Sequence, residues 1–196
     1  MKKLLGIFAI WVATIFIWKL LWNFYSADLL YEKSQLYLAK GDIEMASNLA
    51  DKAIQNNKSE PNYYRGRAKI LIVGAGYTNG ILSESAKEKV LADLEKAVSL
   101  NPNNLVTLRN CIPLYYFLAV KDISIPAGIN NVDEKYLLIV WDHFRQIKSR
   151  FDHDAGAVSS IAKYEKKLGL TEDFNESVEI IKRLRPDLLE WYESIR

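Results

Sequence analysis

Cysteine and histidine are scarce in this chain of 196 residues, which has one cysteine and two histidines. A single cysteine cannot form a disulfide within the chain, and metal or thiolate chemistry has few side chains to use. Cys111 is expected to be a small packing residue. His143 and His153 each follow an aspartate, but adjacent residues on a helix do not face one another. We interpret both histidines as polar surface residues at helix ends, and we expect no metal site and no cofactor.

An excess of positive charge is also missing. The formal net charge is +2, and once three lysines of an apolar N-terminal segment are set aside, residues 26–196 carry 23 basic and 24 acidic side chains. Nucleic-acid binders normally show a basic surplus, so we expect no nucleic-acid partner. The glycine-rich segment 74–80 does not end in Gly-Lys-Ser/Thr, so it is not a phosphate loop. Since the sequence shows no nucleophile–base pair and no spaced carboxylate pair, we expect a protein without enzymatic activity.

A long apolar run lies at the N-terminus, at residues 4–22, interrupted only by Thr14 and Lys19. About 20 apolar residues span the hydrocarbon core of a bilayer, so we predict a transmembrane signal-anchor helix within residues 1–25. Two lysines precede the run and acidic residues follow it, which places the N-terminus in the cytoplasm and the rest of the chain on the extracytoplasmic side. Two alternatives remain open. One is a cleaved signal peptide, although the candidate cleavage site has the bulky Tyr25 where a small residue is needed, and the other is a buried helix of a cytoplasmic protein.

The rest of the chain, residues 26–196, carries a repeat with a period near 34. In the first unit, residues 27–60, small and apolar side chains recur at helical spacing on both sides of Gly41, which is expected to end the first of two helices in a left-handed conformation. Its signature positions hold a large apolar residue, a small residue, a tyrosine and two alanines: Leu30, Ser34, Tyr37, Ala46 and Ala53. Two helices and a tight turn on a 34-residue period resemble the tetratricopeptide repeat (TPR) family. The chain departs from that pattern at Lys58, where the family usually has proline.

Three further units and a polar terminal cap follow in the same order: residues 61–104, 105–154, 155–188 and 189–196. The second unit is lengthened by segment 74–80, which we predict to be a loop, and the third by an insertion at 122–131. Pro113 lies within the first helix of the third unit and is expected to kink or break it. The predicted fold is therefore all-α: a right-handed TPR-like helix-pair solenoid of about four repeats, two with insertions, preceded by a single transmembrane helix. An ordinary helical bundle with accidental spacing is the alternative.

The resemblance also implies a binding groove, because in TPR proteins the first helix of each pair lines a concave surface. Transferring the inward-facing positions to this chain gives eight candidate partner-binding residues: Tyr31, Gln35, Asn62, Arg65, Lys69, Arg109, Tyr116 and Lys163. Four of them are cationic, which would favour an acidic peptide or another anionic ligand. The same cations are equally consistent with solvated helix faces. The family's clamp for a C-terminal carboxylate needs lysine and asparagine where this chain has Tyr31 and Gln35, so that activity is not expected.

These observations predict a membrane-anchored TPR scaffold that holds a partner protein or assembly near the membrane, on its extracytoplasmic side. A role in the cell envelope is what the resemblance implies for proteins of this layout. The alternative is an accessory subunit of a membrane polysaccharide polymerase or of O-antigen-ligase-like glycan machinery. In that case the groove cations would contact glycan or lipid phosphate.

Overall fold

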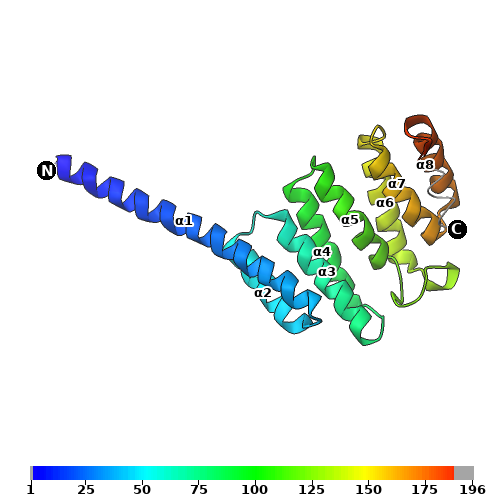
Figure 1. Ribbon diagram of the computed structural model, residues 1–196, viewed down its shortest axis with the longest axis horizontal. Coiled ribbons are helices and arrows are strands. Elements are labelled where there is room, and N and C mark those ends of the chain that lie inside the picture. The colour runs from blue at the N-terminus through cyan, green and yellow to red at the C-terminus, as the bar shows by residue number, and fades with distance from the viewer. Residues whose placement is uncertain (1, 188–196) are drawn as a thin grey trace.

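The computed structural model describes residues 2–187 and shows, within that range, helices arranged as four consecutive pairs (Figure 1). The helices are α1 (Lys2–Ala39), α2 (Ile43–Asn56), α3 (Pro61–Thr78), α4 (Glu84–Leu100), α5 (Leu105–Leu118), α6 (Glu134–Arg150), α7 (Ala155–Leu168) and α8 (Thr171–Leu184), with a short 3₁₀ helix at Ile129–Asn131. The predicted all-α architecture of helix pairs is confirmed. The cap predicted at residues 189–196 lies outside the described residues.

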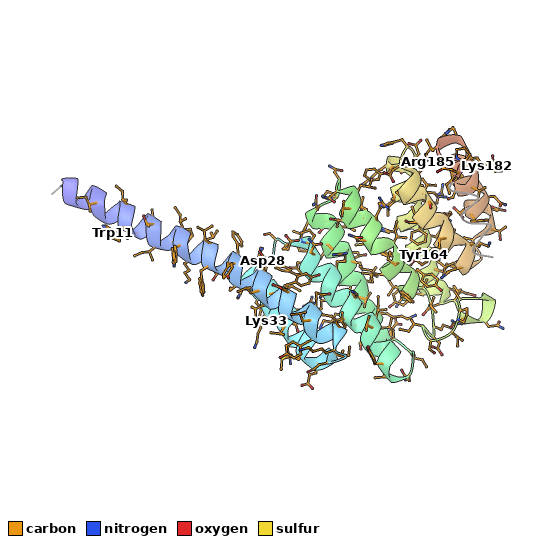
Figure 2. The ribbon with its side chains drawn as sticks, viewed as in Figure 1. Trp11, Asp28, Lys33, Tyr164, Lys182 and Arg185 are labelled. Atoms are coloured by element: carbon orange, nitrogen blue, oxygen red, sulfur yellow. The ribbon has the colours of Figure 1, made fainter. Side chains whose placement is uncertain are left out.

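The first helix, α1, is continuous across the predicted boundary between residues 25 and 26. Its N-terminal half projects from the body of the molecule (Figure 1), and side chains such as Trp11 point into open space (Figure 2). From Ile10 to Ala39 the helix is long and apolar enough to cross a membrane, a property that signal sequences and buried core helices share. Full burial begins at Ala27, which packs against the second and third helices. One helix therefore forms both the projecting apolar segment and the start of the first repeat.

Small side chains bring α1 and α2 close together in the first pair. Ala46, Ala50 and Ala53 of α2 are fully buried, and Ser34 Oγ of α1 donates a 2.8 Å hydrogen bond to the carbonyl of Ala46. Between the two helices Gly41 has a φ of +79°, a left-handed conformation that glycine adopts without steric cost. The helix–turn–helix predicted for the first unit is confirmed.

The loop predicted at residues 74–80 is wrong for most of its length, because α3 continues through the first five of these residues. Two glycines of α3 face other helices at close range. A Cβ on Gly66 would collide with the Tyr31 ring, and one on Gly74 would lie 2.8 Å from the side chain of Ile43. These glycines allow close approach between helices, and the burial that results offsets their low helix propensity.

Pro113 does not break its helix. The fifth helix, α5, runs from Leu105 to Leu118 with the proline inside it, so the predicted break is wrong. A proline removes one backbone donor and crowds the preceding turn, which costs about 3 kcal/mol in a helix interior. Packing holds the helix together, since the flanking side chains are at most 8% exposed: Leu108, Cys111, Ile112, Leu114 and Tyr115.

The extended connections of the second and third units contact each other. Ile81 and Asp122 form an isolated antiparallel bridge, and the backbone N–H of Ile123 donates a 2.7 Å hydrogen bond to the carbonyl of Gly80. Within the longer connection, Asn131 is buried, and its side chain forms two 2.9 Å hydrogen bonds with the backbone of Asp122. These backbone contacts therefore connect the second unit to the third.

The hydrophobic core is distributed along the stack of helices. The most extensive cluster reaches from α3 to α7 and includes large buried side chains such as Leu94, Tyr136 and Phe144. Smaller clusters join α1 to α2 and α3, and α7 to α8. A chain of neighbouring cores is the pattern expected of stacked repeats, each of which buries its apolar face against the next.

Candidate functional site

The first helices of the four units, α1, α3, α5 and α7, carry all eight predicted groove residues, and each packs against the next. Three of the eight residues meet where α1 contacts α3. Tyr31 is half-buried, with its ring centroid 5.0 Å from that of Tyr63. Burial raises the pKa of Tyr31, and the neighbouring Arg65 opposes that shift. Asn62 in turn accepts a 3.1 Å hydrogen bond from Arg65 Nη2.

Two buried donors in this region have no acceptor. Gln35 Nε2 on α1, one turn beyond Tyr31, and Arg65 Nε on α3 are shielded from solvent and have no hydrogen-bond partner within the described part of the chain. A buried N–H group without an acceptor costs about 1–3 kcal/mol.

The other three predicted cations are exposed along the stack. Lys69 lies on α3, Arg109 on α5 and Lys163 on α7. Arg109 reaches the first turn of α7, where a Cβ on Gly156 would be 3.2 Å from its Nη2. Lys163 Nζ lies 5.6 Å from the ring centroid of Tyr164. Positive side chains therefore extend from the second unit to the fourth.

The structure places Tyr116 inside the molecule, so its side chain is not exposed as binding surface. Tyr116 is 6% exposed, its ring centroid lies 4.8 Å from that of Tyr164, and burial raises its pKa. Lys167 Nζ lies 5.6 Å from the same ring. Tyr164 and Lys167 occupy positions of the fourth unit that the family pattern does not select, so no sequence signal identified them. Tyr164 is half-buried and Lys167 is exposed, and both lie next to Tyr116 at the α7 end of the stack.

Three cations that lie buried or half-buried between helices are neutralised by carboxylates. These ion pairs are Arg67 with Asp51 and Asp93, Lys87 with Asp133, and Lys148 with Glu165 and Glu176. The four groove cations differ, because none of them makes an ion pair with any residue that the structure describes: Arg65, Lys69, Arg109 and Lys163. These four predicted groove residues therefore carry positive charge that no ion pair compensates within the described residues.

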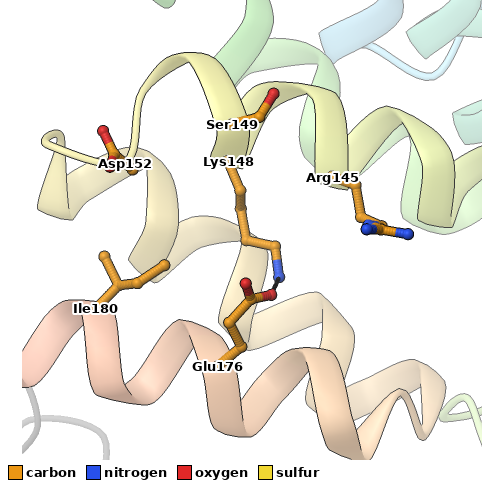
Figure 3. A pocket seen from close by; sticks show the side chains of 6 residues that line it. All are labelled: Arg145, Lys148, Ser149, Asp152, Glu176 and Ile180. Atoms are coloured by element: carbon orange, nitrogen blue, oxygen red, sulfur yellow. Dashed lines mark hydrogen bonds and ion pairs between the residues drawn. The ribbon is translucent and has the colours of Figure 1, made fainter.

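A hollow of about 270 Å³ lies between α6 and α8, and Arg145, Lys148 and Glu176 contribute to its lining (Figure 3). Lys148 Nζ lies 2.8 Å from Glu176 there and 2.9 Å from the buried Glu165 of α7. Burial disfavours the charged ammonium, but hydrogen bonds to Glu176 and Glu165 outweigh it and raise the pKa of Lys148. Because the ammonium already has these partners, it offers no free charge to a ligand.

Cys111 is fully buried, which confirms its expected packing role, and burial raises the pKa of its thiol to about 11. A thiol with that pKa is protonated and unreactive at neutral pH. Between residues 2 and 187, no group of three or more histidine, cysteine, aspartate or glutamate side chains is placed to hold a metal ion.

The prediction that His143 is a surface residue at a helix end is wrong. It lies well inside α6, and its imidazole stacks on the Tyr115 ring with 3.8 Å between centroids. Its Nε2 is buried and has no hydrogen-bond partner among the described residues. Burial lowers the pKa of His143 from 6.5 to about 4, against the opposing effect of Asp142. The imidazole is therefore neutral at pH 7. His153, by contrast, is exposed beside Asp152, as expected.

Acid is expected to destabilise the fold through His143. Its pKa is about 4 in the folded chain and 6.5 when unperturbed, so the unfolded chain binds the proton first and stability is lost as the pH falls from 6.5 to 4. The loss reaches roughly 2–3 kcal/mol, at about 1.4 kcal/mol per pKa unit.

Urea unfolding at pH 7 and pH 4.5 measures this loss of stability, and His143→Phe should be less sensitive to acid by most of that amount. His153→Gln, at an exposed position, should behave like the wild type. An unchanged acid sensitivity in His143→Phe would contradict the assignment.

Several solved structures have a similar arrangement of helices. YrrB, described as a TPR protein with an unusual peptide-binding site, matches with a TM-score of 0.52 and 16% identity, over 87% of this chain and 75% of its own. This chain has the TPR fold. MamA from Desulfovibrio magneticus RS-1, from residue 41 to its end, matches with a TM-score of 0.51 and 15% identity, over 82% of this chain and 76% of its own. A further MamA structure matches at a TM-score of 0.51 and 12% identity, over 85% of this chain and 81% of its own.

The similarity is in the fold and not in the amino-acid sequence. No protein-family model matches the sequence, and no curated protein matches it either. The resemblance predicted from the first unit is thus confirmed at the level of a TPR-like helix-pair solenoid.

Proposed function

We propose that this protein is a non-enzymatic scaffold that α1 anchors in a membrane, and that its first helices bind an acidic peptide segment of a partner protein. The observation that carries the proposal is the row of cations on α3, α5 and α7 that have no ion pair within the described residues: Arg65, Lys69, Arg109 and Lys163. Such a row attracts a negatively charged segment and fixes its register. The peptide-binding site of YrrB, which shares the fold, supports a peptide as the ligand.

The region where α1 contacts α3 contains unpaired hydrogen-bond donors as well as positive charge. Gln35 Nε2 and Arg65 Nε are both buried donors without an acceptor in the described part of the chain. A peptide supplies carbonyl groups along its backbone and carboxylates on acidic side chains, and charge-assisted hydrogen bonds are roughly twice as strong as neutral ones. Tyr31, half-buried beside these donors, adds flat contact area at low entropic cost. In this proposal a peptide supplies acceptors to these two buried donors only if the contact between α1 and α3 opens to admit it.

Reversal of three groove charges is expected to abolish binding. Arg65→Glu, Lys69→Glu and Arg109→Glu together replace attraction by repulsion, and the affinity should fall by at least ~100-fold if each lost contact contributes about 1 kcal/mol. The partner is first captured by photo-crosslinking of the full chain in native membranes. A synthetic peptide from the crosslinked segment is then titrated, and its binding to the wild type should weaken as ionic strength rises.

A matched control reverses three exposed lysines on the second helices, Lys52→Glu, Lys89→Glu and Lys96→Glu. This variant has the same net charge as the groove variant and should bind like the wild type. If the folded groove variant captures the same partner with unchanged affinity, the groove is not the binding site and the proposal fails. Recovery of a multispan glycan polymerase or ligase as the partner would favour the accessory-subunit function over a general scaffold.

In this proposal the repeats lie on the extracytoplasmic side of the membrane. Two lysines precede the apolar run at residues 4–22, whereas Asp28 and Glu32 follow it. Positive charge is retained on the cytoplasmic side of single-span anchors, which supports a cytoplasmic N-terminus.

Labelling of a single introduced cysteine tests this topology. The native Cys111 is buried and should not react, so Ser59→Cys, at an exposed position between α2 and α3, provides one accessible thiol. A membrane-impermeant maleimide is expected to label this variant in intact cells or spheroplasts, and to leave the wild type unlabelled. Labelling that appears only after permeabilisation would place the repeats in the cytoplasm.

A further inference from the structure

The helices α4 and α6 are joined at their N-terminal ends. Lys87 of α4 is 3% exposed, and its Nζ contacts Asp133, which precedes α6, at 2.8 Å. Glu84, at the start of α4, accepts hydrogen bonds from Tyr136 at 3.0 Å and from Lys135. Further along both helices a cleft of about 250 Å³ opens between them. It involves the second helices of two units and is separate from the groove of the first helices.

The cleft combines an apolar interior with two carboxylates. Val98 of α4 and Ile139 of α6 contribute aliphatic surface, and the imidazole of His143, which stacks on the buried Tyr115 ring, contributes aromatic surface. Two further lining residues are acidic, exposed and placed one on each helix: Glu95 of α4 and Asp142 of α6. Within the described residues neither of them makes an ion pair. Gln146, which also lines the cleft, donates a 2.7 Å hydrogen bond to Asp142 Oδ2, but no cation neutralises either carboxylate within the described residues.

We propose that this cleft binds an arginine side chain of a partner protein, at a second site beyond the proposed groove. The apolar stem of arginine suits the aliphatic surface of Val98 and Ile139. Its planar guanidinium stacks on aromatic rings and donates forked hydrogen bonds to carboxylates, here those of Glu95 and Asp142. The volume of the cleft accommodates one long side chain. An imidazole that is neutral at pH 7, as in His143, adds no repulsion to the bound cation.

Other ligands suit this chemistry less well. An anion would be repelled by Glu95 and Asp142. A purely apolar side chain would cover both carboxylates and leave them desolvated without a partner, which is costly. A metal ion requires a convergent set of ligands, and the described residues contain no group of three such side chains. A cation with an apolar stem satisfies the aliphatic, aromatic and acidic surfaces together.

The presence of only two histidines allows a direct test. The full chain in detergent micelles, labelled with ¹³C at histidine Cε1, gives two resonances, and His153→Gln assigns them. N-acetyl-arginine-amide is titrated against N-acetyl-citrulline-amide, an uncharged probe of nearly the same shape. The arginine probe is expected to shift the His143 resonance saturably, and the citrulline probe to bind at least about tenfold more weakly.

Paired variants identify the carboxylates responsible. Glu95→Gln with Asp142→Asn should raise the Kd for the arginine probe by about tenfold or more. Glu88→Gln with Glu134→Gln, two exposed carboxylates on the same helices, should leave the Kd unchanged. The His143 resonance without probe confirms that each variant keeps its fold. The proposal is overturned if arginine gives no saturable shift, if both probes bind equally, or if the two pairs of variants have equal effects.

Discussion

Replacement of Lys148 by methionine is expected to lower the free energy of unfolding by about 3–5 kcal/mol, the usual cost of removing one partner from a buried ion pair. Lys148 is 5% exposed, and its Nζ lies 2.9 Å from Glu165 and 2.8 Å from Glu176, so one cation of α6 joins α7 and α8. Glu165 is itself 1% exposed. Burial raises the pKa of Glu165, but contacts from the Lys148 ammonium and from Ser177 Oγ, at 2.7 Å, favour its charged form. Methionine would leave this carboxylate without a counter-ion.

Chemical unfolding of the full chain in mild detergent measures the loss, and hydrogen exchange locates it. Exchange should accelerate most in α6, α7 and α8, because each repeat is stabilised mainly by its neighbours. Lys182→Met is the matched control, since its ion pair with Glu179 is exposed and should contribute ~0.5 kcal/mol or less. Adding Glu165→Gln to Lys148→Met should restore part of the stability. Equal losses in the two lysine variants would mean that Lys148 contributes no more than a surface ion pair.

The sequence predicted the fold correctly at positions where the residue type has only one structural interpretation. Gly41 ends a helix in the left-handed conformation, and Ala46 and Ala53 pack where the repeat requires small side chains. Segment 74–80 had two explanations, because glycine favours a turn and also permits close contact between helices. The side chain that decides, Ile43, lies on another helix and is invisible to local pattern. Pro113 is similar, since the burial of α5 outweighs a local preference for a break.

The sequence predicted which helix carries each candidate site residue, because the position in the repeat determines that. It did not predict how buried or how paired each side chain is. Lys148 and Lys163 look alike in the sequence, yet one is buried among carboxylates of two other helices and the other is exposed. His143 and His153 each follow an aspartate, but only His143 stacks on Tyr115 of another helix. Ion pairing, burial and the shifted pKa values depend on contacts between repeat units. The sequence pattern of one unit carries no information about these contacts.

A loss comparable to that at Lys148, about 3–5 kcal/mol, is expected from Arg67→Met in the first half of the stack. Arg67 Nε and Nη2 donate hydrogen bonds to the two carboxylate oxygens of Asp93 at 2.8 and 2.5 Å, and Nη1 donates to Asp51 at 2.6 Å. One guanidinium of α3 thus joins α2 to α4. The hydrogen bonds to Asp93 raise the pKa of Arg67 although burial opposes them. Asp93 is 3% exposed, so methionine would leave this buried carboxylate without its cation. Arg67→Lys keeps the charge but loses the forked geometry, and it should show an intermediate loss.

Arg65→Met provides the comparison that separates stability from binding on one helix. Arg65 precedes Arg67 by two residues and makes no ion pair with any described residue. The Arg65 variant should therefore lose only ~1 kcal/mol of stability or less, while peptide affinity falls about tenfold. Arg67→Met should lose stability but keep its peptide affinity within about twofold, at temperatures where it remains folded. Unfolding midpoints and peptide titrations on both variants measure the two effects. If Arg65→Met destabilises the chain as much as Arg67→Met, the unpaired cation has a structural role and the groove loses its main support as the binding site.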